Sequence, residues 1–203
     1  MNSDLIELKG DPFIIDLMYA RTDNMFGRAV YQEIGFGNHA FFHRDMWQKL
    51  QALIPLLQQH NLKLKICDAY RPPLAHQKML ELIPQKGFFA QTPYLSQHCR
   101  GTAVDAVLTD MSGRELEFPT KVDGYTPQFF EQVQAGNFVP FFEHLQKASH
   151  NWQQGLSAAA VANRKLLCEL MEQVGLEALP HEWWHYNLPD GNSEAYPLID
   201  WQS

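Results

Sequence analysis

The spacing of hydrophobic and polar residues along the chain predicts several short strands. Apolar and β-branched residues fill 13–19, and apolar positions alternate with lysines over 62–67, so both segments are typical of strands. A strand entered through a glycine turn is expected at 101–108, and a last short strand at 183–187. Residues 20–38 are expected to form a loop, because they combine an Asp-Asn pair with three glycines.

Helical spacing of apolar residues distinguishes a second set of segments. Four helices are expected: 41–60, 74–83, one that starts at Thr126-Pro127, and 157–174. Pro55 predicts a kink or an early end in the first of these helices. Ser157 is expected to cap the last helix, and Gly175 to end it. Because strands and helices do not alternate regularly, the pattern favours an α+β fold with a small central antiparallel sheet flanked by helices.

The composition is that of one globular domain. Of the 203 residues, 45% are hydrophobic and 19% are charged, and no repeat or Pro/Gly-rich linker divides the chain, so residues 1–203 are expected to form a single domain. A net charge of −7 argues against nucleic acid and against an anionic membrane as partners. The first ten residues lack the pattern of a signal peptide, and the three cysteines lack a disulfide framework, so we expect a cytoplasmic protein.

Histidine beside a carboxylate is the most distinctive chemistry of the chain. Of nine histidines, three lie in two such segments, 96–105 (SQHCRGTAVD) and 181–185 (HEWWH). A catalytic zinc ion takes three His, Asp or Glu ligands and keeps one position open for water. His98 and Asp105 flank a glycine turn and are candidates to meet at one ion. In this interpretation Glu182 is the base and His185 is the third ligand.

A second interpretation of 181–185 arises because HEWWH matches the HExxH pattern of zincin proteases. In that pattern both histidines bind zinc from one turn of a long helix, so His181 would also be a ligand. Pro180 and Pro189 leave only eight residues between them, and paired tryptophans favour extended structure. These features favour the interpretation that leaves His181 out.

Two further alternatives need no metal. In the first, the histidines are ordinary hydrogen-bonded loop residues, which two independent His/carboxylate segments make less plausible. In the second, Cys99 and His98 form a nucleophilic pair. Adjacent residues of an extended chain point in opposite directions, which argues against that pair.

Four sequence blocks, in order along the chain, resemble the zinc D-alanyl-D-alanine dipeptidases of peptidase family M15, which are related to the Hedgehog fold. The blocks are D-x-x-Y-A-x-x-D-N at 16–24, C-D-A-Y-R-P-P at 67–73, S-x-H-x-x-G-x-A-x-D at 96–105 and E-W-W-H at 182–185. Together they span nearly the whole chain. Ala69 departs from the glycine usual in the second block, and 125–157 is longer than expected and is a candidate to reshape a pocket lid.

The resemblance implies a set of site residues and one bound Zn²⁺ per chain. It makes His98, Asp105 and His185 the zinc ligands, Glu182 the catalytic base, Arg71 the group that stabilises the oxyanion, and Tyr19, Ser96 and Asp123 the residues that hold the substrate's ammonium group. Asp123 is carried over from a stretch, KVDGY, that aligns only loosely with the family.

The implied activity is hydrolysis of D-alanyl-D-alanine, or of a similar small D,D-dipeptide, with zinc-bound water as the nucleophile. The implied partner is therefore a small dipeptide. One alternative is a carboxypeptidase or endopeptidase that acts on peptidoglycan stem peptides, against which the missing signal peptide argues. Another is a zinc-binding module without catalysis, against which Glu182 and Arg71 argue, since structural zinc needs neither.

Overall fold

The computed structural model describes residues 4–83 and 89–201. Its centre is a five-stranded sheet in the order β2 (Phe13–Ile15), β4 (Lys63–Asp68), β5 (Ala103–Thr109), β7 (His185–Asn187) and β6 (Glu177–Ala178). All neighbouring pairs are antiparallel except β2 and β4, which are parallel. The expected α+β architecture is confirmed, with one parallel pair added to the antiparallel sheet.

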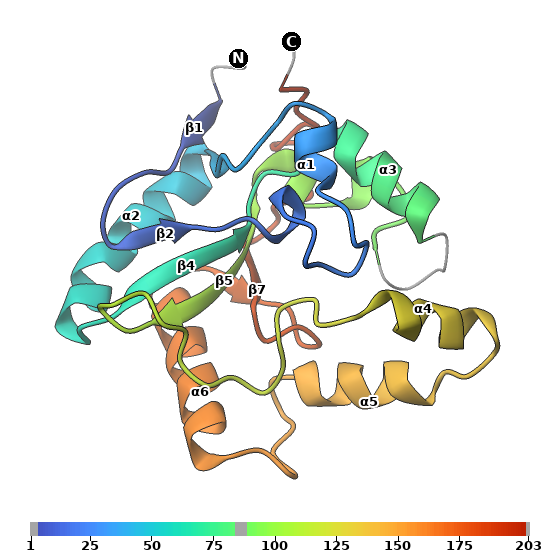
Figure 1. Cartoon of the computed structure of the whole chain (residues 1–203). Helices are drawn as coiled ribbons and strands as arrows, with labels where there is room; N and C mark the ends of the chain where they lie inside the picture. The colour runs from blue at the N-terminus through green and yellow to red at the C-terminus, as the bar shows by residue number, and fades with distance from the viewer. Residues whose placement is uncertain (1–3, 84–88, 202–203) are drawn as a thin grey trace.

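Helices surround this sheet, as Figure 1 shows. The two longest, α2 (Arg44–Gln59) and α6 (Ala158–Gln173), contact each other, and they contact β4 and β5 respectively. The remaining helices are α1 (Val30–Glu33), α3 (Pro73–Leu82), α4 (Pro127–Gln134) and α5 (Val139–Ala148), with 3-10 turns at Met18–Ala20, Pro93–Leu95 and His98–Arg100. Helices α4 and α5 lie side by side, away from the strands (Figure 1). A small second sheet pairs β1 (Leu5–Glu7) with β3 (Phe41–His43).

The expected 41–60 helix differs from the structure at its start and at its proline. Residues 41–43 form β3, and the helix begins at Arg44 and runs through Pro55 to Gln59. The early end is wrong, because Pro55 is exposed while Leu53 and Leu57 beside it are buried. The proline ring therefore lies on the solvent-facing side of the helix, and packing of the buried leucines holds the helix together across the missing hydrogen bond.

Smaller differences occur at three other predicted segments. The strand expected over 13–19 is confined to β2, and a 3-10 turn follows it. The expected loop 20–38 contains the short helix α1. The strand expected over 183–187 begins only at His185, because Trp183 and Trp184 lie in a turn and pack into the core. Ser157 caps α6 as expected, since its hydroxyl accepts a hydrogen bond from Ala160 N at 3.0 Å.

The central strand β5 positions the site. All seven of its residues are buried, so it runs through the middle of the core with β4 on one side and β7 on the other. Charged and polar side chains on this strand therefore need partners inside the protein. Among the described residues, no helix is long and apolar enough to cross a membrane.

Candidate metal centre and active site

The three candidate ligands come from two paired strands and one turn. Asp105 in β5 lies directly opposite His185 in β7 in the antiparallel register. His98 begins the 3-10 turn that precedes β5, and Gly101 ends that turn in the left-handed conformation with φ 69°. A Cβ on Gly101 would lie 2.7 Å from His43 N, so only glycine fits this close approach of two backbones. The turn carries His98 back over Asp105.

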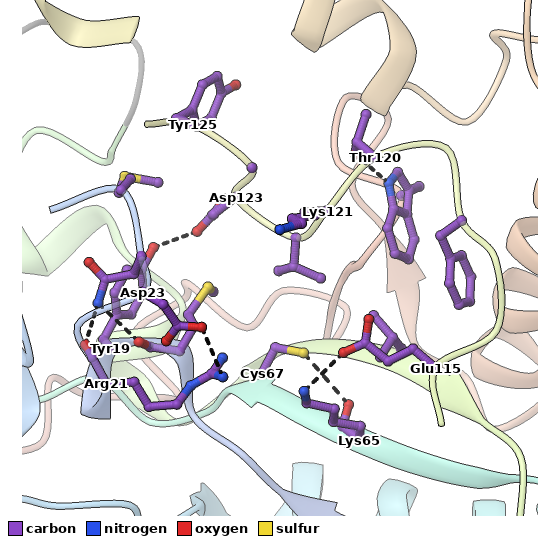
Figure 2. Close-up of a pocket in the computed structure, with 18 of the residues that line it drawn as sticks. Tyr19, Arg21, Asp23, Lys65, Cys67, Glu115, Thr120, Lys121, Asp123 and Tyr125 are labelled. Atoms are coloured by element: carbon purple, nitrogen blue, oxygen red, sulfur yellow. Dashed lines mark hydrogen bonds and ion pairs between the residues drawn. The ribbon is translucent and has the colours of Figure 1, made fainter. Parts of the chain in front are cut away.

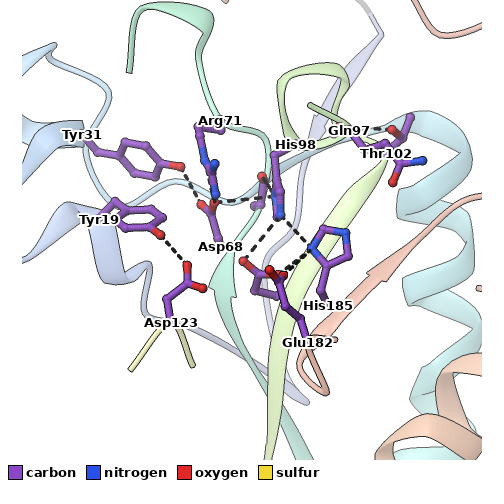
Figure 3. A network of polar contacts seen from close by, with 12 residues as sticks. Tyr19, Tyr31, Asp68, Arg71, Gln97, His98, Thr102, Asp123, Glu182 and His185 are labelled. Carbon is purple, nitrogen blue, oxygen red and sulfur yellow. Dashed lines mark hydrogen bonds and ion pairs between the residues drawn. The ribbon is translucent and has the colours of Figure 1, made fainter. Parts of the chain in front are cut away.

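The ligand atoms of these residues are spaced as a tetrahedral metal site requires. His185 Nδ1 lies 3.0 Å from Asp105 Oδ1 and 3.2 Å from His98 Nε2. His98 Nε2 lies 3.5 Å from Asp105 Oδ2. Ligand atoms bound at zinc distances of 2.0–2.1 Å in a tetrahedron lie about 3.3 Å apart. Two imidazoles and one carboxylate at this spacing fit a zinc ion, with one coordination position left for water (Figure 3).

A backbone carbonyl on the side of the ring away from the ligand cluster fixes the orientation of His98. Its Nδ1 lies 2.8 Å from the carbonyl oxygen of Ala69. A carbonyl only accepts hydrogen bonds, so Nδ1 carries the proton and donates it, which turns the lone pair of Nε2 toward Asp105 and His185. Such a partner on the far ring nitrogen is usual for metal-binding histidines.

Electrostatics favour an ionised Asp105 among the two histidines. Burial raises its pKa, but the charge of His98 and the hydrogen bonds from His185 and His98 outweigh burial and hold the pKa well below its usual range. Burial lowers the pKa of His98, but Asp105 and Asp68 outweigh it and raise that pKa. The cluster therefore holds a carboxylate anion ready for a cation.

Glu182 stands beside this cluster with a carboxyl group suited to proton transfer. Its Oε2 lies 3.8 Å from His185 Nδ1, and 32% of its side chain is exposed. Burial of the carboxyl, the largest cause, and the nearby carboxylates Asp123 and Asp105 outweigh the charges of His185 and Arg71 and raise its pKa to about 8. A pKa near neutrality is what general acid–base work requires.

Arg71 points toward the same site and is anchored by a residue that the sequence analysis missed. Its Nε and Nη2 donate to Asp68 Oδ2 at 3.1 and 2.7 Å. Tyr31 donates to the other oxygen, Oδ1, at 2.6 Å. The guanidinium also lies 5.2 Å from the ring centre of Tyr19. Asp68 lies inside the CDAYRPP block, and this position could have marked it as a site residue. Tyr31 lies in a segment predicted as loop, where no sequence pattern pointed to a role in the site.

Two of the three predicted ammonium-binding residues meet. Tyr19 donates its hydroxyl to Asp123 Oδ2 at 2.5 Å (Figure 3). Burial, with the charge of Asp105, outweighs Tyr19 and Arg71 and raises the pKa of Asp123 to about 6. Ser96 is buried and lines the same pocket as Arg71 and the ligands, but no contact joins it to Tyr19 or Asp123 among the described residues.

The cluster opens into a pocket of about 400 Å³ that is lined by the ligands, Glu182, Arg71, Ser96 and Asp123. Asp123 also lines a second cavity, of about 710 Å³ (Figure 2). Tyr19 lines this second cavity. The hydrogen-bonded pair of Tyr19 and Asp123 therefore stands at the boundary between the two.

The zincin interpretation lacks its helix. Residues 181–184 are turn or irregular backbone, and β7 begins at His185. His181 is exposed and takes no part in the ligand cluster. The two histidines of HEWWH consequently do not share a helical face.

Comparison with known proteins identifies the family of the chain. A family model of peptidase family M15, described as D-ala-D-ala dipeptidase, matches residues 7–199. A relative from Escherichia coli (strain K12) named D-alanyl-D-alanine dipeptidase is 32% identical over 185 residues, which are 91% of this chain and 82% of the relative.

Two relatives of the same name come from enterococci. The one from Enterococcus faecium is 29% identical over 64% of this chain and 50% of its own length. The one from Enterococcus faecalis (strain ATCC 700802 / V583) is 30% identical over 55% of this chain and 43% of its own length. With a family match over nearly the whole chain, the protein belongs to the D-alanyl-D-alanine dipeptidase family of M15 peptidases.

Proposed function

We propose that the protein hydrolyses D-alanyl-D-alanine, or a similar small D,D-dipeptide, to two free D-amino acids with one bound Zn²⁺ per chain. The observation that carries the proposal is the cluster of His98, Asp105 and His185 at zinc-ligand spacing, with Glu182 beside it in one pocket. The names of the relatives supply the substrate class.

In this proposal His98 Nε2, His185 Nδ1 and the Asp105 carboxylate hold the metal. Zinc bound there would acidify a water molecule and polarise the scissile carbonyl. The donor set suits this task, because three protein ligands leave one position open, whereas a purely structural site is closed by four. The hydrogen bond from His98 Nδ1 to the carbonyl of Ala69 keeps this imidazole oriented with Nε2 toward the ion.

Glu182 moves the proton. Its carboxylate removes a proton from the attacking water and then delivers it to the nitrogen of the leaving amino acid. The balance is that of a hydrolysis: one water is consumed, the amide C–N bond breaks, hydroxyl joins the acyl carbon and hydrogen joins the amine. The raised pKa and the partial exposure of the side chain suit a group that must hold and release a proton beside the substrate.

Arg71 stabilises the negative charge that develops on the carbonyl oxygen. Its guanidinium is held by Asp68 before the substrate arrives, so little reorganisation is needed as the charge forms. Asp123, with Tyr19, receives the ammonium group of the substrate, and Ser96 makes a further polar contact in the pocket. Because Asp123 stands at one end of the pocket, a free amino terminus is expected there.

The remaining assignments extend the same proposal. We place the protein in the cytoplasm as one catalytic domain, 1–203, without nucleic acid or membrane as partner. Three free cysteines are typical of a reducing compartment, and the net charge of −7 disfavours binding to nucleic acid or to an anionic membrane. Strands from both halves of the chain join in one sheet, which supports a single domain.

The test is release of free D-alanine from D-alanyl-D-alanine by the purified protein. We expect turnover that a chelator abolishes and that zinc restores. In Glu182→Gln, kcat should fall by about 10²–10⁴, the usual worth of a general acid–base group, while the zinc content stays at one per chain. Glu177→Gln, which changes an exposed glutamate on β6, is the matched control and should keep full activity.

The same assay separates the competing functions. Cleavage of an N-acylated D-Ala-D-Ala peptide without cleavage of the dipeptide would replace the proposal with a carboxypeptidase. Bound zinc without turnover of either substrate would leave a zinc-binding module.

A further inference from the structure

The long segment between the Asp123 turn and α6 has no role in the proposed chemistry, yet one of its side chains packs against the site. Helix α5 carries His144, whose ring centre lies 4.2 Å from that of Tyr125. A Cβ added to Gly124 would lie 3.1 Å from His144 Cε1, so the imidazole lies directly against the backbone of this turn. Both neighbours directly follow Asp123 in the chain.

His144 also lies near the segment that carries a metal ligand. The centre of its ring lies 6.3 Å from that of Trp184, and Trp184 directly precedes His185. The end of α5 is tied to the same segment, because Trp183 N donates to the carbonyl of Ala148 at 3.0 Å. His144 thus lies between the turn that bears Asp123 and the strand that bears His185.

The Asp123 turn needs such support. Asp123 has a φ of 42°, in the left-handed region that residues other than glycine seldom occupy. Within the turn Tyr125 N donates to Asp123 O at 2.7 Å, and the Asp123 side chain accepts from Tyr19. A strained residue persists when its surroundings fix it, and His144 supplies one of the surfaces against this turn.

We propose that His144 is a positioning residue, whose ring holds the Asp123–Tyr125 turn where the Asp123 carboxylate meets the substrate's ammonium group. The inference rests on the proposed ammonium-binding role of Asp123. It gives the α4–α5 segment a role in substrate specificity. A change in α5 would alter recognition of a free amino terminus although α5 does not touch the substrate.

The Nε2 atom of His144 does not stabilise the fold. Its Nε2 is buried and has no hydrogen-bond partner among the described residues, which is unfavourable for folding. His150 shares this property: its Nε2 is also buried and unpaired, while its ring packs on Tyr186 and its imidazole hydrogen-bonds the backbone of Glu182 rather than the Asp123 turn. His150→Ala therefore controls for the loss of a half-buried imidazole at the end of the same segment.

The experiment compares two substrates of the zinc-loaded enzyme. D-alanyl-D-alanine has an ammonium group, and propanoyl-D-alanine has the same scissile amide without it. The ratio of their kcat/KM values measures recognition of the ammonium. We expect His144→Ala to lower this ratio by about tenfold, through KM for the dipeptide, with kcat/KM for propanoyl-D-alanine within about twofold of the unmodified enzyme. Zinc content should not change.

Two further variants decide between outcomes. Asp123→Asn should lower the ratio, and His144→Ala added to it should lower it no further, since both changes act on one interaction. His150→Ala should leave the ratio unchanged. Should His144→Ala not fold, His144→Gln takes its place.

The inference is overturned if His144→Ala and His150→Ala lower kcat/KM for both substrates equally, or if the effects of His144→Ala and Asp123→Asn are additive. A ratio that Asp123→Asn does not change would instead reject the ammonium-binding role of Asp123, and this outcome is separate from any result for His144.

Discussion

Asp68 joins side chains from separate parts of the chain around one buried carboxylate. Its side chain has no exposed surface, and it accepts hydrogen bonds from Tyr31 and Arg71. His98 Nδ1 lies 3.6 Å from Asp68 Oδ2. A buried guanidinium stays charged, so it needs this counter-charge. Asp68 therefore sets the position of Arg71 although it does not line the pocket.

We expect Asp68→Asn to lower the free energy of unfolding by about 3–5 kcal/mol, because it leaves a buried guanidinium without its anion. It should also lower kcat, since Arg71 loses its anchor. Tyr31→Phe removes only one neutral donor from the same carboxylate and should cost about 1 kcal/mol. Urea unfolding and steady-state kinetics measure both effects. Equal losses of unfolding free energy and of kcat in the two variants would show that the ion pair between Asp68 and Arg71 does not account for the effect of Asp68→Asn.

The ionisable residues of the site are the part that the sequence predicts best. His98, Asp105, Glu182 and His185 lie in two short segments whose chemistry has few other uses. The supporting residues were not predictable in this way. Tyr31 meets Asp68 across 37 positions of chain, and His144 meets Tyr125 from a helix of ordinary composition. Such pairs carry no local pattern, because only the tertiary fold brings them together.

At the scale of elements, patterns predicted interiors better than ends. The helix over 44–59 continues through Pro55 because this proline faces solvent. Which side of the helix faces solvent is set by the orientation of the helix on the core. The aromatic run at 183–184 is apolar like a strand, yet Trp183 stacks on Phe118, with ring centres 4.3 Å apart, and donates to Thr120. Core packing therefore replaced strand pairing for Trp183, whereas the carbonyl of Trp184 still accepts a hydrogen bond from Ala106 N of β5 at 3.0 Å.

The turn between His98 and β5 makes a prediction that tests one element. Gly101→Ala must accept both a φ of 69° and a Cβ 2.7 Å from His43 N, so the turn has to shift. We expect a lower melting temperature together with weaker zinc binding, because His98 belongs to the displaced turn. Gly136→Ala is the matched control: its φ is 85°, but a Cβ there meets nothing within 4 Å.

Thermal unfolding and competition with a chelator of known affinity measure the two effects of Gly101→Ala. The control should lose about 1 kcal/mol of stability, as left-handed alanine does, with zinc affinity unchanged. Equal zinc affinity in both variants would contradict the part that this turn plays in holding His98.

At the scale of the whole molecule, the metal-free site holds protons that unfolding would release. Burial raises the pKa of Glu182 to about 8, and Asp105 and Asp68 raise that of His98 against the effect of burial. Burial lowers the pKa of His76 and His144 to about 4 and also lowers that of His150, so these three oppose the trend only below their unfolded pKa of about 6.5. Above that pH the folded state binds more protons than the unfolded one, and stability falls as pH rises.

We therefore expect the melting temperature of the metal-free protein to fall between about pH 6.5 and about pH 8. Glu182→Gln should flatten this fall, because the amide does not titrate. Zinc should reverse it, since the ion replaces the protons and binds more tightly as pH rises. Calorimetry across this range, with and without zinc, measures the slopes. A metal-free melting temperature that rises over this range would contradict the raised pKa of Glu182 and of His98.

The pairing of Asp105 with His185 affects the rate at which a bound ion is released rather than the affinity for that ion. Both residues lie on neighbouring strands of the central sheet, where backbone amides exchange with solvent only when much of the molecule opens. The backbone of these two ligands is therefore the slowest part of the site to change, whereas the turn that holds His98 can shift while the sheet stays paired. We therefore expect the half-life of bound zinc in excess chelator to depend first on movement of the turn that holds His98.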